Sequence, residues 1–296
     1  MVPWDCPTCG KGDKKFIGMR GGAHHRYGLG VECRIVRCSS CTLMFADPFP
    51  VPVETSEIYG DPERYFENHD PEGHLDGHRA LVLEVVRRAT ADSPSILDVG
   101  SGRGEFLRAA ADLGLERTVG LELSAAMVRY ARENHHVEVF EETVEEHSAR
   151  ISGVRYDAVI LSAVLEHVHN PDTTIAAIGQ LSRPGALLYL DIPQEPHLAA
   201  HVGNALNRLQ RKNSVLNLSP TFTPFHVYGF SRRALETLLK KHNFVIEERK
   251  VWASPRVPST GAPRDRILSL IGTQVNRVAN LTRTASNQYV WARLQE

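Results

Sequence analysis

The stretch Ser95-Ile-Leu-Asp-Val-Gly-Ser-Gly-Arg-Gly-Glu-Phe-Leu107 decides the fold of this chain. A short apolar run ends in three glycines at alternate positions, Gly100, Gly102 and Gly104, and a helical apolar pattern begins at Phe106. The pattern predicts a strand, a tight glycine turn and a helix. Glycine lets the backbone turn sharply and approach a ligand with no Cβ in the way, and the free N–H groups at a helix start favour an anionic group.

Apolar runs typical of strands alternate with helical patterns after this turn. We expect strands over 118–123, 137–140, 156–162 and 186–192, and helices that begin after Ser124 and Asn170. This alternation predicts an α/β fold with a doubly wound parallel sheet. Since ligands of such sheets lie outside the carboxyl ends of the strands, Asp98, Glu122 and Ser162 are expected on one rim.

The spacing Asp-x-Gly-x-Gly-x-Gly differs from the dinucleotide fingerprint, which is Gly-x-Gly-x-x-Gly. Asp98 stands before the first glycine, and Glu122 stands at the end of the next strand, where its carboxylate can accept both hydroxyls of a ribose. This combination resembles the class I methyltransferases that use S-adenosylmethionine. Segments 157–167, 170–171, 181–185 and 230–244 follow in the order of the small-molecule members, and the resemblance covers roughly residues 75 to 253. The alternative is a βαβ turn whose glycines serve packing only.

The resemblance implies a Rossmann-like sheet of seven strands with one antiparallel strand, for which residues 288–293 are the candidate. It implies that the glycine loop meets the methionine end of the cofactor, that Glu122 holds the ribose, and that residues 141–143 flank the adenine. Arg103 inside the loop and Asn243 before Phe244 depart from the family pattern. The residues expected to bind S-adenosylmethionine are Asp98, Gly100, Ser101, Gly102, Glu122, Leu123, Glu142, Thr143, Ser162 and Ala163.

Four of the five cysteines form two Cys-x-x-Cys pairs, Cys6 with Cys9 and Cys38 with Cys41. Two such pairs predict a structural Cys₄ zinc site, because each pair can turn both thiolates toward one ion. The segment between the pairs is rich in glycine and has little core of its own, so that metal would supply folding energy. Disulfides are the alternative, disfavoured because the chain shows no signal peptide. Cys33 is expected to be a free thiol.

Composition describes an ordinary globular protein, with 42% hydrophobic residues and a formal net charge of −1. The missing signal peptide and the lack of a long apolar stretch make a cytoplasmic location the expectation. Net charge gives no sign of a nucleic-acid or membrane partner, although a local patch can hide in a neutral total.

The chain is expected to divide into three parts. Residues 1–46 form the zinc-binding module, residues 47–73 a linker or cofactor lid, and residues 74–296 the methyltransferase domain. The aromatic residues Tyr59, Tyr65 and Phe66 either fold over the cofactor or pack against the domain. Insertions at 196–224 and 254–286 each carry a helix with an apolar face, which either covers the acceptor as a lid or, for the second, builds a homodimer interface.

Methyl transfer by in-line displacement mainly requires alignment of the two reactants. A hydroxyl acceptor also benefits from a general base, for which His226 is favoured, with His167 and Tyr228 as further candidates. A structural histidine near a helix start is the alternative for His167. The expected function is methyl transfer to a small molecule such as a sugar or secondary metabolite, with oxygen favoured. The alternatives are an RNA or protein methyltransferase with the cysteine segment as substrate reader, and a non-catalytic S-adenosylmethionine-binding protein.

Overall fold

The computed structural model describes residues 5–25, 28–50, 71–221, 225–257 and 263–295. Most of the expected linker, including Tyr59, Tyr65 and Phe66, lies outside these ranges. The chain forms two compact units. The first combines residues 1–50, 191–238 and 249–289, and the second combines residues 51–190, 239–248 and 290–296.

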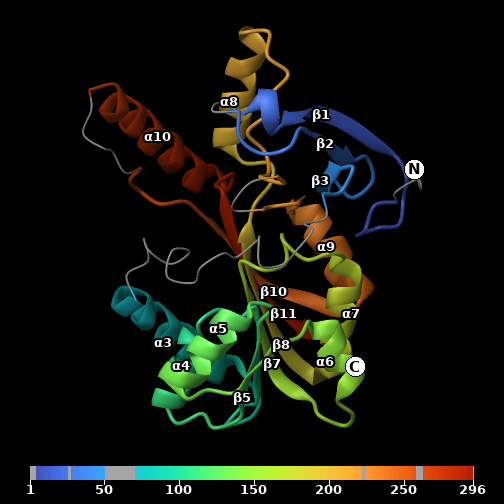
Figure 1. Cartoon of the computed structure of the whole chain (residues 1–296), viewed down its shortest axis with the longest axis vertical. Coiled ribbons are helices and arrows are strands. Elements are labelled where there is room, and N and C mark those ends of the chain that lie inside the picture. The colour runs from blue at the N-terminus through green and yellow to red at the C-terminus, as the bar shows by residue number, and fades with distance from the viewer. Residues whose placement is uncertain (1–4, 26–27, 51–70, 222–224, 258–262, 296) are drawn as a thin grey trace. The chain divides into compact units, whose positions relative to one another are not determined.

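A seven-stranded sheet is built from strands that lie between residues 96 and 294 (Figure 1). Strand β4 pairs in parallel with both β5 and β7, and β5 pairs in parallel with β6. The predicted Rossmann-like sheet of seven strands is therefore confirmed. Its strand order is β10 (Phe244–Trp252), β11 (Asn287–Leu294), β8 (Ser182–Pro193), β7 (Tyr156–Ser162), β4 (Ile96–Val99), β5 (Thr118–Leu121) and β6 (Val139–Phe140).

Helices cover both faces of the sheet, with α3, α4 and α5 on one side and α6 and α7 on the other (Figure 1). Polar caps start three of them: the Ser124 side chain accepts the N–H of Met127, and the Thr143 and Asn170 side chains cap the next two. The bounds are α3 (Pro71–Arg88), α4 (Glu105–Asp112), α5 (Ala125–Tyr130), α6 (Val144–Arg150), α7 (Pro171–Leu181) and α9 (Arg232–Lys241).

The central strands are buried on both faces. Ile96, Leu97 and Ile160 are inaccessible or nearly so. A Cβ on Gly120 in β5 would lie 2.7 Å from the Leu107 side chain, so that this glycine lets α4 pack directly on the sheet. The tight fit fixes the glycine turn between β4 and α4.

The first unit holds a second, antiparallel sheet in the order β1-β2-β3-β9. Val215 and Leu218 from the first insertion complete the core between β2 and β3. The cysteine-bearing segment thus shares its core with residues inserted between β8 and β10 of the larger sheet. The elements are β1 (Lys14–Arg20), the 3₁₀ turn η1 (Gly22–His24), β2 (Cys33–Cys38), β3 (Met44–Asp47), α8 (Leu198–Leu209), β9 (Tyr228–Gly229) and α10 (Pro263–Thr282).

Candidate functional site

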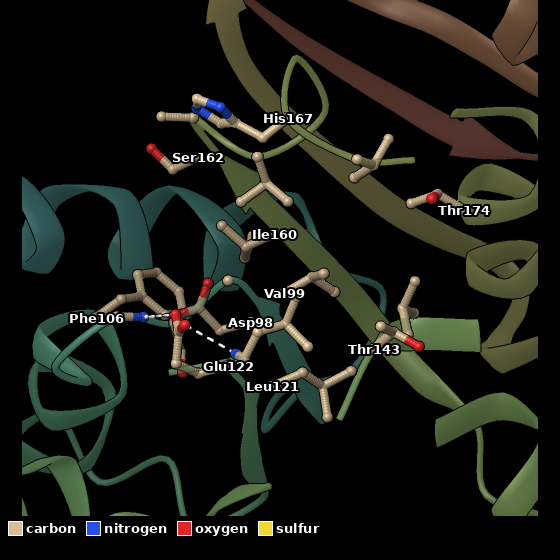
Figure 2. Close-up of a pocket in the computed structure, with 18 of the residues that line it drawn as sticks. Asp98, Val99, Phe106, Leu121, Glu122, Thr143, Ile160, Ser162, His167 and Thr174 are labelled. Carbon is tan, nitrogen blue, oxygen red and sulfur yellow. Dashed lines mark hydrogen bonds between the residues drawn. The ribbon is translucent and has the colours of Figure 1, made fainter. Parts of the chain in front are cut away.

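A cavity of about 720 Å³ opens where β4, β5 and β7 end (Figure 2). Pockets that hold small ligands typically enclose roughly 300–1,000 Å³. All the residues expected to bind the cofactor line this one cavity, together with His167. They are Asp98, Gly100, Ser101, Gly102, Glu122, Leu123, Glu142, Thr143, Ser162 and Ala163.

The glycine loop forms the floor between β4 and α4. Gly100, Gly102 and Gly104 have φ values of 73°, 54° and 80°, which side chains other than glycine rarely adopt. A Cβ on Gly100 would also lie 2.4 Å from the Val164 side chain. Backbone conformation and close packing therefore both require glycine at position 100, as the sequence pattern indicated.

Glu122 lies at the end of β5 with 7% of its surface exposed. Its Oε1 accepts the N–H groups of Leu123 and Ser124, both at 2.8 Å, and its Oε2 accepts the N–H of Gly102 at 3.0 Å. A carboxylate offers about four acceptor positions. The carboxylate is thus locked in place by three amides and retains an acceptor position on Oε2 for a ligand hydroxyl.

Asp98 lies deeper in the same pocket and is 5% exposed. Burial, followed by the negative charges of Glu122 and Glu105, raises the pKa of Asp98 to about 7. A cationic group beside Asp98 would stabilise its carboxylate and offset the charges of Glu122 and Glu105. The electrostatics of the pocket therefore favour a ligand that brings a positive charge to Asp98.

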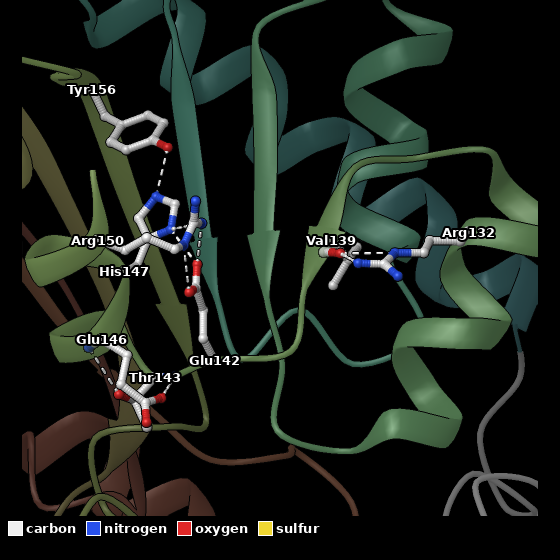
Figure 3. Close-up of polar contacts among 8 residues, drawn as sticks. All are labelled: Arg132, Val139, Glu142, Thr143, Glu146, His147, Arg150 and Tyr156. Carbon is white, nitrogen blue, oxygen red and sulfur yellow. Dashed lines mark hydrogen bonds and ion pairs between the residues drawn. The ribbon is translucent and has the colours of Figure 1, made fainter. Parts of the chain in front are cut away.

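The rim after β6 is fixed by a side-chain network (Figure 3). Glu142 Oε1 lies 2.6 Å from His147 Nδ1, and Glu142 Oε2 accepts from Arg150 Nε at 2.8 Å. His147 Nε2 in turn lies 3.0 Å from the Tyr156 hydroxyl. The hydrogen bond from Arg150, aided by that from His147, lowers the pKa of Glu142 below its usual range.

Thr143 on the same rim caps α6. Its hydroxyl accepts the N–H of Glu146 at 3.1 Å, while the Glu146 carboxylate accepts the N–H of Thr143 at 2.7 Å. This capping box was readable in the sequence as Thr-x-x-Glu. The contacts of Glu142 with His147 and Arg150 were not predicted, because no sequence motif around position 142 indicates them.

His167 lines the pocket from the turn between β7 and α7, and α7 itself starts at Pro171. The His167 Nε2 lies 3.8 Å from Oε1 of the buried Glu166. Other lining residues that the sequence did not single out come from α3 and from the start of α7. They are His78, Leu81, Asn170, Thr173 and Thr174.

The other two predicted catalytic residues, His226 and Tyr228, belong to the first unit. Tyr228 is fully buried, and its ring lies 5.7 Å from that of Phe49. Burial raises the pKa of Tyr228 well above its usual range. Tyr228 therefore contributes to the core of the first unit, whereas His226 is half-buried and its carbonyl accepts the N–H of Ser219.

The four paired cysteines converge in the first unit. Their sulfur atoms all lie within 4.8 Å of one another, with Cys6 and Cys41 at 3.5 Å and Cys9 and Cys38 at 3.6 Å. Four thiolates around one Zn²⁺ at about 2.3 Å stand about 3.8 Å apart, so the cluster has the dimensions of a closed zinc site. Cys33 lies outside the cluster, and burial raises its pKa to about 11.

Both cysteine turns have the geometry that directs two thiolates to one point. The Cys38 sulfur accepts the N–H groups of Ser40 and Cys41, each at 3.4 Å. Gly10 and Thr42, the residues that follow the two pairs, have φ values of 68° and 70°. Thr42 keeps this conformation while its hydroxyl lies 2.6 Å from that of Ser231.

Comparison with known proteins assigns the family. The model of a methyltransferase domain family matches residues 73–249. The ubiquinone biosynthesis O-methyltransferase of Escherichia coli O7:K1 is 38% identical over 94 residues, which cover 30% of this chain and 39% of that protein. The protein of the same name from Shigella boydii serotype 18 is 37% identical over 94 residues with the same coverage. The match thus spans about two fifths of the length of these relatives.

Solved structures agree on the fold. A crystal structure of an S-adenosylmethionine-dependent methyltransferase from Archaeoglobus fulgidus superposes with a TM-score of 0.52 at 13% identity, covering 77% of this chain and 99% of that one. A chain from a complex of a methyltransferase activator with a methyltransferase of Haloferax volcanii gives a TM-score of 0.55 at 15% identity, covering 80% and 98%. With the family match and the glycine-loop pocket, they identify the chain as a member of the methyltransferase domain family and a class I S-adenosylmethionine-dependent methyltransferase.

Proposed function

We propose that the enzyme moves the methyl group of S-adenosylmethionine to an oxygen of a small-molecule acceptor. The observation that carries this proposal is the single cavity that gathers every residue expected to bind the cofactor. The cofactor supplies an activated methyl group on a sulfonium. The O-methyltransferase name of the relatives with 38% and 37% identity supports oxygen as the methylated atom.

The residues of the pocket suit the separate parts of the cofactor. Glu122 holds a ribose hydroxyl through its remaining acceptor position, and its three amide contacts keep the carboxylate oriented. Asp98 faces the ammonium of the methionine end, and the negative charges of Glu122 and Glu105 that help to raise its pKa also favour a cation beside it. Glu142 and Thr143 flank the adenine from the rim after β6, and Ser162 and Ala163 border the reacting sulfur.

Proton removal from the acceptor hydroxyl falls to a histidine. A neutral imidazole suits this role near neutral pH. His226 is our first candidate, and His167 is our second. His167 lines the pocket, and the carboxylate of Glu166 lies 3.8 Å from its Nε2. Tyr228 is the weakest candidate, since it is fully buried.

The cysteine cluster is proposed to hold one structural Zn²⁺. Four thiolates close the coordination sphere, so that no position remains for a substrate. The metal would stabilise β2, β3 and the turns that carry the cysteines.

Transfer of a labelled methyl group into a host-cell extract tests the proposal. The extract is separated into small-molecule, nucleic-acid and protein fractions, and a Glu122→Ala variant serves as control. Label that depends on Glu122 and appears in the small-molecule fraction is expected. Label that nuclease or protease removes would contradict the small-molecule acceptor. It would favour the alternative in which the cysteine segment recognises RNA or protein.

A further inference from the structure

Helix α10 in the second insertion turns its small and polar residues toward its own chain. Asn280 donates to the carbonyl of Ala253 at 3.0 Å and accepts the N–H of Ala253 at 2.8 Å. The Thr273 hydroxyl accepts the N–H of Val257 at 3.2 Å, and a Cβ on Gly272 would lie 3.0 Å from the Val257 side chain. The face that packs on segment 253–257 is therefore polar and closely fitted.

The opposite face of α10 presents large aliphatic side chains to solvent. Surface helices of globular proteins normally bury this stripe and expose the polar one. In α10 the arrangement is reversed, and an exposed apolar face of this kind marks an interaction site. The exposed fractions are 59% for Ile267, 55% for Leu268, 64% for Leu270, 56% for Ile271, 49% for Val278 and 85% for Leu281.

Helix α8, which contacts α10 in the same unit, repeats the pattern. Asn204 faces inward, donates to the side-chain oxygen of Asn217 at 2.7 Å and accepts the N–H of Leu216 at 2.8 Å. Val202, Leu206 and Leu209 are spaced along the outer side and are 41%, 53% and 82% exposed. Both insertions therefore anchor a helix through polar groups and leave its aliphatic side uncovered.

The charge of the two insertions is strongly asymmetric. Residues 196–224 and 254–286 contain eight of the 34 lysines and arginines but only one of the 35 acidic residues, Asp265. Their net charge is thus +7 in a chain whose total is −1. Arg266 and Arg277 are exposed on α10, where helical spacing puts them along one edge of the aliphatic stripe.

From this combination we infer that α8 and α10 dock the enzyme on the surface of an anionic lipid bilayer. An amphipathic helix with aliphatic residues on one face and arginines beside them lies in the interface, with its apolar side among the acyl chains. Anionic headgroups attract each nearby arginine by about 1 kcal/mol. No helix in the described ranges is long and apolar enough to span a bilayer.

The same residues disfavour the other partners of an exposed face. Pairing of α10 with a second copy would bring like charges together, because the helix carries three arginines and a single acid, Asp265. A nucleic acid matches the positive charge but gains nothing from six exposed aliphatic side chains on one helix. A lipid surface uses both the charge and the aliphatic side chains.

Flotation with lipid vesicles tests the inference on the full chain. Vesicles of phosphatidylcholine alone are compared with vesicles that contain about one third phosphatidylglycerol. The test variants are Ile267→Ser/Leu270→Ser/Ile271→Ser and Arg266→Gln/Arg277→Gln. Leu83→Ser and Arg87→Gln serve as matched controls, because both residues are exposed on α3 and lie outside the insertions.

The wild-type protein and both controls are expected to float with the anionic vesicles and to be released by salt. The arginine pair should lower the vesicle affinity about 25-fold, since about 1 kcal/mol per arginine equals about fivefold. The triple serine variant should lose flotation. Leu270→Trp should show a blue-shifted emission with anionic vesicles while Leu83→Trp does not, which reports insertion in a folded protein.

Three results would overturn the inference. Wild-type protein that stays in the unbound fraction would show that this face of α8 and α10 does not bind anionic lipid. Equal binding of the triple serine variant would show that charge alone is responsible and that no apolar face inserts. A concentration-dependent dimer that the triple variant abolishes, with no flotation of the wild type, would assign the face to a second copy.

Discussion

Asp98 connects cofactor binding to pH. Its pKa of about 7 results first from burial and then from the charges of Glu122 and Glu105. If the cofactor ammonium lies against it, binding lowers this pKa and releases a proton. The affinity for S-adenosylmethionine should therefore rise from about pH 6 to about pH 8, and Asp98→Asn should remove most of this dependence. Titration calorimetry across this range in two buffers of different ionisation enthalpy measures both effects, and a flat profile for the wild type contradicts the assignment.

The same carboxyl should weaken the free protein at alkaline pH. Folding raises the pKa of Asp98 from about 3.9 in an unfolded chain to about 7, so that its destabilising effect is absent below about pH 4, grows between about pH 4 and pH 7, and is complete at alkaline pH. Asp98→Asn should therefore stabilise the free protein at about pH 8 by roughly 1–4 kcal/mol and change little at about pH 4. Thermal unfolding at both pH values tests the sign. An equal shift at both would show that charge is not the cause.

At the scale of elements, the two cysteine turns and strands β2 and β3 form one metal-dependent piece. Purified protein should contain about one Zn²⁺ per chain, and chelation should lower its melting temperature. Cys38→Ser should lose the metal, since its sulfur lies 3.6 Å from that of Cys9. Cys33→Ser is the matched control, because Cys33 is equally buried in β2 but stands outside the cluster. Metal analysis of the wild type and the two variants tests whether the cluster binds Zn²⁺. A metal-free wild type purified without chelator would refute the site.

The first residues of helices were predictable where a side chain caps the helix N-terminus. Ser124 and Asn170 were expected as helix starts, and both side chains accept the N–H groups of the first turn. Strand β8 was expected from Ala186 because Arg183-Pro-Gly185 resembles a helix stop. The structure starts β8 at Ser182, whose φ of −93° and ψ of 144° are already extended. A proline and a glycine end a helix but do not exclude an extended strand.

At the scale of the whole molecule, the parallel sheet and the position of the pocket followed from the sequence. Both depend on local alternation and on the rule that ligands lie at the carboxyl ends of strands. The composition of the first unit did not follow. Val215 and Leu218 pack into the core of β2 and β3, and β9 pairs with β3. These contacts join residues far apart in the sequence, and local hydrophobic periodicity does not predict such contacts. The contribution of α3 to the pocket through His78 and Leu81 was missed for the same reason.

The proposed reaction needs a general base, for which His226 is the first candidate. His226→Ala should lower kcat by about 10²–10⁴-fold with little change in cofactor affinity, because a general base acts on the acceptor. His167→Ala is the comparison, since His167 lines the cofactor pocket itself. Measured pH profiles of kcat separate a base from a structural residue: removal of the base abolishes the acidic limb. Unchanged turnover of His226→Ala would transfer the role to His167.

The central claim is that S-adenosylmethionine binds in the pocket at the ends of β4, β5 and β7. Calorimetry of S-adenosylmethionine with the wild type, Glu122→Ala and Glu133→Ala tests it most directly, because Glu133 is exposed and outside the pocket. Loss of a charged hydrogen bond of about 1.5–3 kcal/mol should weaken binding to Glu122→Ala about 10- to 150-fold, while Glu133→Ala binds like the wild type. Equal affinity of all three proteins, or no binding to the wild type, would contradict the account.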